Sequence, residues 1–432
     1  MMDEQRFKQT EIGMIPEDWQ ISTIEKATER IIDYRGKTPR KTAYGIPLIT
    51  AKIVKNGHIL EPEEFISEKD YEAWMRRGTV REGDVIITTE APMGEVAQLD
   101  ERKVALAQRI ITLRGKQNVL HNDFLRYVLQ SPMLRNELRK RESGTTVTGI
   151  KQSELRKVQL PIPSYSEQEA IAKILFDLDS EIELNQQMNK TLESIGKAIF
   201  KHWFVDFEFP NGEGKPYKSS GGEMVYNEDL EKDIPKGWQV GPFSDVIEVN
   251  PKRELTTGEI ATKVSMADLN PWQACIENWN HEEYKSGPKF KNEDTLFARI
   301  TPSLENGKTA LVSILNDAEV GFGSTEFIVF GKKAISSELY IFHLSRSQEI
   351  RKAAISAMTG TSGRQRVPDA LFDHLPIILP PVTVLNQFEE ACSSLFDQIS
   401  NNAKQTKILS QIRNSLLPKL MSGKIRVPVE VR

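Results

Sequence analysis

Cysteine, long apolar runs and one-sided charge are all scarce in this sequence, and each shortage narrows the class of protein. Only two cysteines, Cys275 and Cys392, occur in 432 residues, which is too few for a disulfide framework and fits a reduced, cytosolic setting. The first residues, MMDEQRFKQTEIG, are polar, and no apolar run approaches the roughly 18 residues that cross a bilayer. We therefore expect a cytoplasmic protein that has no membrane segment. The net charge of -4 gives no global sign of a nucleic-acid partner.

Sequence motifs of catalysis and cofactor binding are also missing. The chain has no G-x-x-x-x-G-K-[ST] phosphate loop, so ATP-driven translocation is not expected of it. Asn270-Pro271-Trp272 comes nearest to the paired-proline tetrapeptide of amino-methyltransferases and lacks the second proline. The six histidines are scattered without metal-ligand spacing. The sequence thus predicts a non-enzymatic chain with no catalytic residues, no cofactor and no metal site.

The most informative stretch is a long amphipathic segment that runs from Ser166 to Lys201. It contains no proline, and Ser166 with Glu169 has the form of a capping box. About 36 residues at 1.5 Å each would make a rod of roughly 54 Å. Its apolar residues recur at spacings of three and four, as in a helix with one apolar stripe: Ile171, Leu175, Leu178, Ile182, Leu192, Ile195 and Ile199.

A second segment of the same kind lies near the C-terminus. Sustained spacing of three and four over this length predicts a coiled-coil seam. Both segments are polar in the middle, at Asn185-Gln186-Gln187 and Asn401-Asn402, and one buried polar layer typically fixes the register of a seam. The alternative is two unrelated helices, each docked on its own domain. The second register consists of Leu385, Phe388, Cys392, Leu395, Ile399, Asn402, Thr406, Leu409, Arg413, Leu416 and Leu420.

The two halves of the chain share a repeated set of motifs. The length of 432 residues, 39% of them hydrophobic, is sufficient for two hydrophobic cores. IPEDWQ at Ile15 returns as IPKGWQ at Ile234. Gly83-Asp84-Val85-Ile86 followed by Pro92 is matched by Glu293-Asp294-Thr295-Leu296 followed by Pro302. The centres of the two halves differ, which predicts two modules of one architecture that bind different targets.

Within each half, short β-rich runs and short helical patterns do not alternate regularly. Val85–Thr89 and Glu326–Phe330 are typical strands, whereas Phe124–Leu129 has a helical pattern. This mixture predicts an α+β fold. Asp206–Gly222, rich in Gly, Ser, Pro and Lys, has the composition of a surface linker between the halves.

The motifs around the two long segments make the chain resemble the specificity (S) subunit of a type I DNA restriction–modification system. They are IPEDWQ, IPKGWQ, GTTVTGIKQSELRKVQLPIPSYSEQEAIAKIL, FKHWFVDFEFPNGEGKPYKSSGGEM and LLPKLMSGKIRV, and they cover nearly the whole chain in the expected order. The resemblance implies two target-recognition domains, each reading one half of a split, asymmetric site in double-stranded DNA. It further implies that the long helices pair as an antiparallel coiled coil, which sets the gap between the half-sites and docks two methyltransferase subunits.

The resemblance also implies a division of the chain and further partners. Restriction/translocase subunits would join the complex, and the partners would bring S-adenosylmethionine, ATP and Mg²⁺. The implied segments are a first target-recognition domain at 1–165, a spacer helix at 166–205, a linker at 206–230, a second recognition domain at 231–381, a second spacer helix at 382–421 and a tail at 422–432.

Basic and hydroxyl residues in the predicted loops are the candidates for DNA contact, since such side chains neutralise phosphates or bind base edges. Two plainer interpretations stay open: the residues up to Arg141 could form a solvated helix face, and Arg299 could sit in a structural ion pair. The candidates are Arg35, Lys37, Thr38, Arg40, Lys41, Arg139, Lys140, Arg141, Thr145 and Lys151 in the first half, and Arg299, Thr361, Arg364, Gln365 and Arg366 in the second.

Two other functions remain open from the sequence. A scaffold with twin protein-binding modules would have the same repeated plan, but its binding would lack the steep salt dependence of phosphate contacts. A specificity chain of a related restriction system would share the fold.

Overall fold

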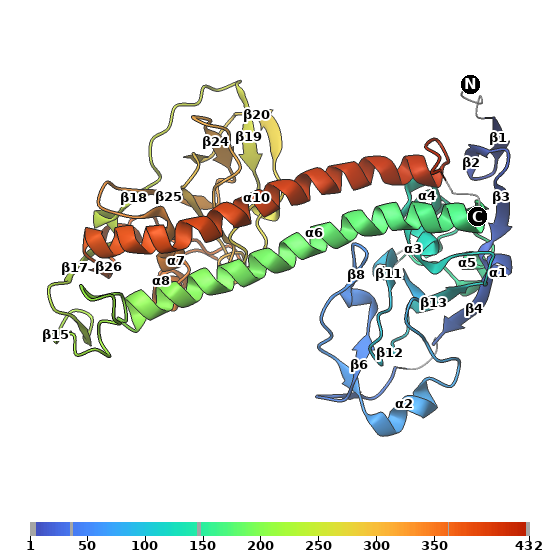
Figure 1. Cartoon of the computed structure of the whole chain (residues 1–432), viewed down its shortest axis with the longest axis horizontal. Helices are drawn as coiled ribbons and strands as arrows, with labels where there is room; N and C mark the ends of the chain where they lie inside the picture. Colours follow the sequence, from blue (N-terminus) through green and yellow to red (C-terminus); the bar gives the residue numbers. More distant parts are fainter. Residues whose placement is uncertain (1–5, 35–37, 145–147, 362, 429–432) are drawn as a thin grey trace. The chain divides into compact units, whose positions relative to one another are not determined.

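Two compact units make up the chain in the computed structural model, which describes residues 6–34, 38–144, 148–361 and 363–428. The first unit consists of Met1–Ser180 together with Ser410–Arg432, and the second of Glu181–Leu409. Two long helices, α6 (Tyr165–Phe200) and α10 (Val382–Met421), contribute to both units (Figure 1).

The first unit combines two four-stranded sheets with short helices. Its larger sheet has the antiparallel order β11-β10-β13-β4, and all five residues of β10 are buried. The second sheet has the order β12-β6-β9-β5, and the pairs β1-β2, β14-β3 and β7-β8 complete the unit. The elements are β1 (Phe7–Thr10), β2 (Gly13–Pro16), β3 (Gln20–Thr23), α1 (Ile24–Ala27), β4 (Thr28–Asp33), β5 (Lys41–Thr42), β6 (Ile46–Ile49), β7 (Val54–Lys55), β8 (His58–Ile59), β9 (Phe65–Ile66), α2 (Glu68–Trp74), β10 (Val85–Thr89), β11 (Met93–Gln98), β12 (Ala105–Leu106), β13 (Ile110–Gly115), α3 (Asn122–Gln130), α4 (Pro132–Lys140), α5 (Gln152–Leu155) and β14 (Gln159–Ile162).

The second unit repeats this plan. One sheet has the order β18-β25-β22-β23 and the other β20-β19-β24-β21, with the pairs β15-β16 and β17-β26 beside them. The α+β class predicted from the sequence is therefore confirmed. The elements are β15 (Met224–Asn227), β16 (Lys232–Pro235), β17 (Gln239–Pro242), β18 (Ile247–Val249), β19 (Ile260–Val264), β20 (Asn280–Glu283), β21 (Lys289–Phe290), β22 (Thr295–Ala298), β23 (Thr309–Leu311), β24 (Gly321–Gly323), β25 (Phe327–Lys332), α7 (Glu338–Ser345), α8 (Gln348–Ser356), α9 (Leu371–His374) and β26 (Pro376–Leu379).

A buried aspartate at the start of β10 and another at the start of β22 show how closely the repeat holds. Asp84 binds Arg114 at 2.7 Å and accepts the amide of Arg81 at 2.9 Å. Asp294 binds Arg253 at 3.0 Å and accepts the amide of Lys291 at 2.9 Å. Because both carboxylates are about 1% exposed, they need these partners. The duplicated sequence frame thus corresponds to duplicated contacts.

The long helices pack antiparallel within each unit. In the first unit, Arg413 of α10 binds Asp179 of α6 at 2.8 Å. In the second, the amide of Asn402 donates to the side-chain oxygen of Asn189 at 2.9 Å. The positions of α10 predicted for the seam are buried or half-buried. In α6 the buried or half-buried seam positions that the structure shows are Ile171, Leu175, Leu178, Ile182, Asn185, Asn189, Leu192, Gly196 and Ile199.

One predicted seam residue of α6 lies outside the seam. Ile195 is 42% exposed, and Gly196 occupies the buried position in its place. A Cβ on Gly196 would lie 3.1 Å from the Phe396 ring and 3.2 Å from the His343 ring. The prediction of Ile195 as a seam residue was therefore wrong. The rings of Phe396 and His343 leave little space beside α6 here, and Gly196 fits because it has no Cβ.

The ends of α6 also differ from the prediction. The helix begins at Tyr165, and the amide of Glu167 donates to the hydroxyl of Ser164 at 3.3 Å, so Ser166 is not the capping residue. Beyond the helix, the predicted surface linker begins inside the core. Phe207 and Phe209 are 5% and 6% exposed and pack against Trp238.

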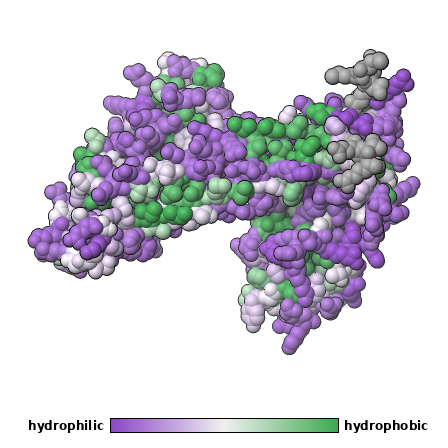
Figure 2. Space-filling model, in the orientation of Figure 1, coloured by the Kyte–Doolittle hydropathy of each residue, from purple (hydrophilic) through white to green (hydrophobic). Residues whose placement is uncertain are grey.

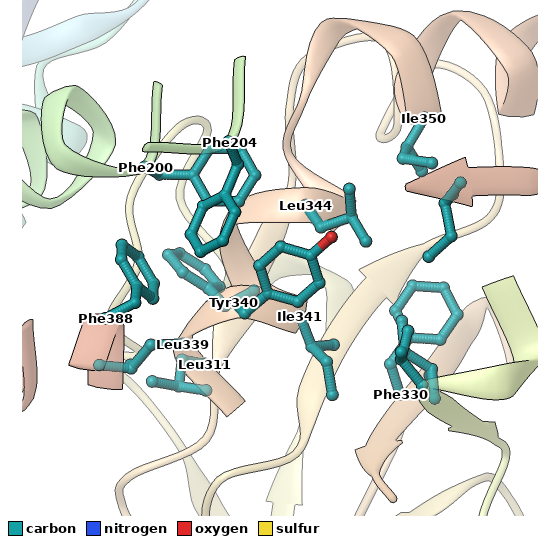
Figure 3. Close-up of a cluster of buried hydrophobic side chains, with 14 of the residues drawn as sticks. Phe200, Phe204, Leu311, Phe330, Leu339, Tyr340, Ile341, Leu344, Ile350 and Phe388 are labelled. Atoms are coloured by element: carbon teal, nitrogen blue, oxygen red, sulfur yellow. The ribbon is translucent and has the colours of Figure 1, made fainter. Parts of the chain in front are cut away.

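Aromatic side chains join the end of α6 to the second unit. Figure 3 shows Phe200 and Phe204 of this segment facing Tyr340 of α7, with Phe388 of α10 beside them. The ring centroids of Phe204 and Tyr340 are 4.8 Å apart, and those of Phe204 and Phe388 are 5.0 Å apart. These edge-to-face contacts fix the C-terminal end of α6 on the core of this unit.

Candidate nucleic-acid interface

Four segments of the first unit, 38–41, 88–91, 107–109 and 148–151, meet beside the end of β10. We call them loop surface 1. The Gln108 side chain donates to the Thr38 hydroxyl at 2.7 Å. The amide of Thr89 donates to the Arg109 carbonyl at 2.8 Å, and the amide of Ile150 donates to the Thr89 carbonyl at 2.9 Å. Segments far apart in sequence are thereby held together by backbone hydrogen bonds.

Loop surface 1 has an exposed cationic rim. Arg40 and Lys151 are exposed, and no carboxylate of the described residues lies within ion-pair distance of either. Lys41 binds Glu64 at 2.8 Å. Arg109 binds Glu90 at 2.8 Å, with 53% and 38% of the two side chains exposed. Arg40 and Lys151 are therefore the cations of this rim that phosphate oxygens could reach without breaking an ion pair.

The corresponding segments of the second unit, 298–302, 324–326 and 363–367, form loop surface 2. The amide of Arg299 donates to the Glu326 carbonyl at 3.0 Å, and the amide of Val367 donates to the Arg299 carbonyl at 2.9 Å. The amide of Thr301 donates to the Gln365 carbonyl at 3.1 Å. The C-terminal end of the predicted basic loop is thus fixed.

The arginines of loop surface 2 fall into two kinds. Arg299 binds Asp369 at 2.9 Å and donates to the Val367 carbonyl at 2.7 Å, which is the structural ion pair left open above. Arg366 instead binds Glu326 through two nitrogens, at 2.6 and 2.8 Å, with 44% of its side chain exposed. The hydrogen bond to Glu326 raises the pKa of the Arg366 guanidinium, so it is charged at every working pH. Arg364 is exposed beside it.

The basic residues of α4 belong to a different feature. Arg139 and Lys140 line a groove of about 840 Å³ between α4, the β1–β2 hairpin and the end of α10. Lys140 binds Glu137 at 2.6 Å, and Arg141 lies 3.8 Å from Glu154. These contacts fit the solvated helix face that was the plainer interpretation.

Two of the remaining candidates for DNA contact lie in described residues and three do not. Thr361 is exposed and Gln365 half-buried on the edge of loop surface 2. Arg35, Lys37 and Thr145 lie outside the described residues. The loop surfaces also contain Arg109, Glu90 and Glu326, which sequence reasoning did not single out. Their pairing becomes visible only when β10 pairs with β13 and β22 pairs with β25.

In the part of the chain that the structure describes, no helix has the length and apolar character to cross a membrane. No cluster of three His, Cys, Asp or Glu side chains there could hold a metal ion.

Comparison with known proteins gives a consistent result. Residues 16–194 match a family model described as type I restriction modification DNA specificity domain. The chain is 29% identical to the type I restriction enzyme MjaIX specificity subunit of Methanocaldococcus jannaschii, over 98% of this chain and 97% of that protein. It is 27% identical to the MjaVIII specificity subunit of the same organism, again over 98% and 97%.

A solved structure supports the fold. The S subunit of a type I restriction–modification system from M. genitalium aligns with a TM-score of 0.58 at 15% identity, covering 93% of this chain and 96% of that one.

Proposed function

We propose that this chain is a specificity subunit of a type I restriction–modification system, and that each of its two units reads one half of a bipartite, asymmetric site in double-stranded DNA. The observation that carries the proposal is the pair of loop surfaces. They share one backbone frame, which the hydrogen bonds at Thr89 and Arg299 define, but present different side chains. A common frame with different chemistry suits the reading of two different half-sites.

The long helices serve in this proposal as spacer and docking site. Their continuous seam supports a rod that fixes the number of base pairs between the half-sites. Exposed apolar side chains on the helices within the second unit, Leu184, Met188 and Ile408, support docking of other chains. Figure 2 shows apolar surface over parts of both long helices. We assign this surface to two methyltransferase subunits, which restriction/translocase subunits join in the cytosol.

The chain itself acts by binding in this proposal. Its partners supply methyl transfer, ATP hydrolysis and cleavage, and the specificity chain decides where on the DNA they act. This division agrees with the sequence, which has neither a phosphate loop nor a methyltransferase tetrapeptide.

Methylation mapping tests the proposal directly. The chain is co-expressed with the modification subunit of its own system in a host that lacks both, and modified bases are mapped genome-wide. We expect one motif of two specified halves separated by a fixed gap, and its disappearance when this chain is omitted. A DNA affinity of the complex that does not fall with salt, together with no new motif, would instead indicate a protein-binding scaffold.

A further inference from the structure

Each loop surface carries an exposed arginine–carboxylate pair, and the two pairs arise from different backbone positions. The bond from the Thr89 amide to the Arg109 carbonyl matches the bond from the Arg299 amide to the Glu326 carbonyl. Arg109 therefore stands at the same place in the first unit as Glu326 does in the second. A cation in one unit corresponds to an anion in the other.

A second match locates the partners. The Ile150 amide donates to the Thr89 carbonyl as the Val367 amide donates to the Arg299 carbonyl. The residues before them, Gly149 and Arg366, thus correspond. A Cβ on Gly149 would lie 2.8 Å from the Thr89 oxygen, so the first unit has no space for a side chain where the second has its arginine.

In the first unit the guanidinium comes from the position that holds the carboxylate in the second unit. Arg109, which replaces Glu326, pairs with Glu90, and Glu90 corresponds to Ile300. An Arg–Glu pair is thus present in both units although none of the positions holds the same residue. Exposed ion pairs contribute little to stability, so the recurrence indicates a role other than folding.

The free edges of the two guanidinium groups suit base recognition. Arg109 contacts Glu90 through Nε, and its two terminal nitrogens have no partner among the described residues. Arg366 turns Nε and one terminal nitrogen toward Glu326, while its other terminal nitrogen reaches the Arg364 carbonyl at 3.2 Å. A guanidinium fork pairs with the O6 and N7 acceptors that guanine presents in the major groove.

We propose that Arg109 and Arg366 each recognise a guanine edge in the half-site of their own unit, and that Glu90 and Glu326 are positioning residues that hold the guanidinium groups. The proposal rests on the proposed function, because it assigns residues to the DNA reading assumed there. The two arginines arise from different positions of the shared backbone frame. The two units then read guanine at different positions of their half-sites.

The test uses the complex of this chain with its modification subunit and maps the methylated motif for Arg366→Ala and, separately, Arg109→Ala. Each variant should lose the preference for guanine at one position of one half-site by about ten- to one-hundred-fold, with the other half-site unchanged. Lys232→Ala, which removes the exposed Lys232–Glu349 ion pair of the second unit, and Arg156→Ala, which removes the Arg156–Glu25 pair of the first, should leave the motif as in the wild type.

Two results would overturn the inference. A motif that is unchanged while methylation falls evenly at all sites would mean phosphate contact, and equal relaxation of both half-sites would mean a general loss of structure. If the wild-type complex gave no bipartite motif at all, the proposed function itself would fail, which keeps the two failures distinct.

The positioning role has its own readout. Glu326→Gln should relax the same base position as Arg366→Ala by a smaller factor, since the guanidinium remains but is held less firmly. Glu326→Asp, which keeps the charge, should restore most of the preference. A Glu326→Gln variant that relaxed a different position would show that the carboxylate reads a base itself, and would contradict the assignment.

Discussion

At the scale of single residues, polar side chains inside the helix seam of the second unit set its register. Asn402 is 2% exposed and donates to Asn189, which is 4% exposed and donates in turn to the Ile399 carbonyl at 3.3 Å. A buried amide that loses its partner costs more free energy than a paired one contributes. The asparagine layer therefore penalises every register in which the two side chains do not meet.

We expect Asn402→Ala to lower the free energy of unfolding by about 1–3 kcal/mol, because it leaves the buried side-chain oxygen of Asn189 without a donor. Chemical denaturation measures the change. The neighbouring Asn401 is exposed, so Asn401→Ala is the matched control and should change stability by less than about 0.5 kcal/mol. Equal effects of the two variants would argue against the buried layer.

His343 is a second residue with a measurable signature. It lies in the core beside Phe200, with ring centroids 5.5 Å apart. Burial, helped by nearby Arg346, lowers its pKa to about 3. An unfolded histidine takes up a proton below about pH 6.5, whereas this one stays neutral in the fold. Its contribution to stability is therefore complete above pH 6.5 and is lost as the pH falls toward 3.

We expect the free energy of unfolding to fall by about 1.4 kcal/mol between pH 7.5 and 5.5 through this residue alone. In His343→Leu that part of the pH dependence should disappear, as denaturation at the two pH values would show. His58 is exposed, and His58→Leu should keep the wild-type difference. A His343→Leu variant with an undiminished pH difference would mean that another group is responsible.

At the scale of elements, the sequence predicted the two helices and their register well, because the period of apolar residues follows directly from helix geometry. The prediction failed where the burial of a residue depends on a neighbouring element. Gly196 takes the seam position from Ile195 since Phe396 and His343 fill the opposing space, and no feature of α6 itself reveals that. Likewise Phe207 looks like part of a polar linker until Trp238 is placed against it.

The candidate site was less predictable than the helices. Charge clusters in loops drew attention to Arg40, Lys151 and Arg364, which are exposed as expected. They did not reveal Arg109, because an arginine within an apolar run gives no signal until the strand pairing of β10 and β13 puts it beside Glu90. The periodicity of a sequence does not predict contacts between distant segments, and such contacts build the candidate site.

The seam allows the helices to be lengthened without disturbing either loop surface. We expect seven residues inserted after Asn185 together with seven before Thr406, at the same level of the antiparallel pair, to preserve the register. Each helix would grow by about 10.5 Å, so the gap in the methylated motif should lengthen by about three base pairs. Methylation mapping would show the new gap.

Insertion in α6 alone is the control for this design. Because it shifts α6 against α10 by two turns on one side of the insertion, the Asn189–Asn402 and Asp179–Arg413 contacts cannot both be kept, and it should abolish methylation or lower the stability of the complex. A lengthened chain that kept the original gap would contradict the spacer role, and altered half-sites would contradict the independence of the two units.

At the scale of the whole molecule, the C-terminal segment completes the first unit. Leu420 and Met421 are at most 1% exposed in its core. Beyond them, Arg426 binds the buried Glu167 at 2.6 Å and Asp18 at 2.8 Å, and it lies over the Trp19 ring. Asp18 and Trp19 of the IPEDWQ motif thus contact the segment that follows α10.

We expect Arg426→Ala to destabilise the first unit by about 1–2 kcal/mol, since the buried Glu167 side chain would lose its hydrogen bonds from the guanidinium. Adding Glu167→Gln should recover part of the loss. Lys424 is exposed in the same segment, and Lys424→Ala should be nearly neutral. Thermal unfolding of the three variants measures these changes in stability. If the Arg426→Ala protein were as stable as the Lys424→Ala protein, the contact of Arg426 with Glu167 and Asp18 would be dispensable.

The dependence of the first unit on residues 410–432 also reverses the usual order of events on the ribosome, where the domain that is made first is the first to fold. Its strands emerge early, yet its core stays incomplete until Leu420 and Met421 have been translated, by which time the second unit is already whole. A chain that stops before Leu420 therefore lacks part of the core of the first unit, while the second unit keeps all of its residues.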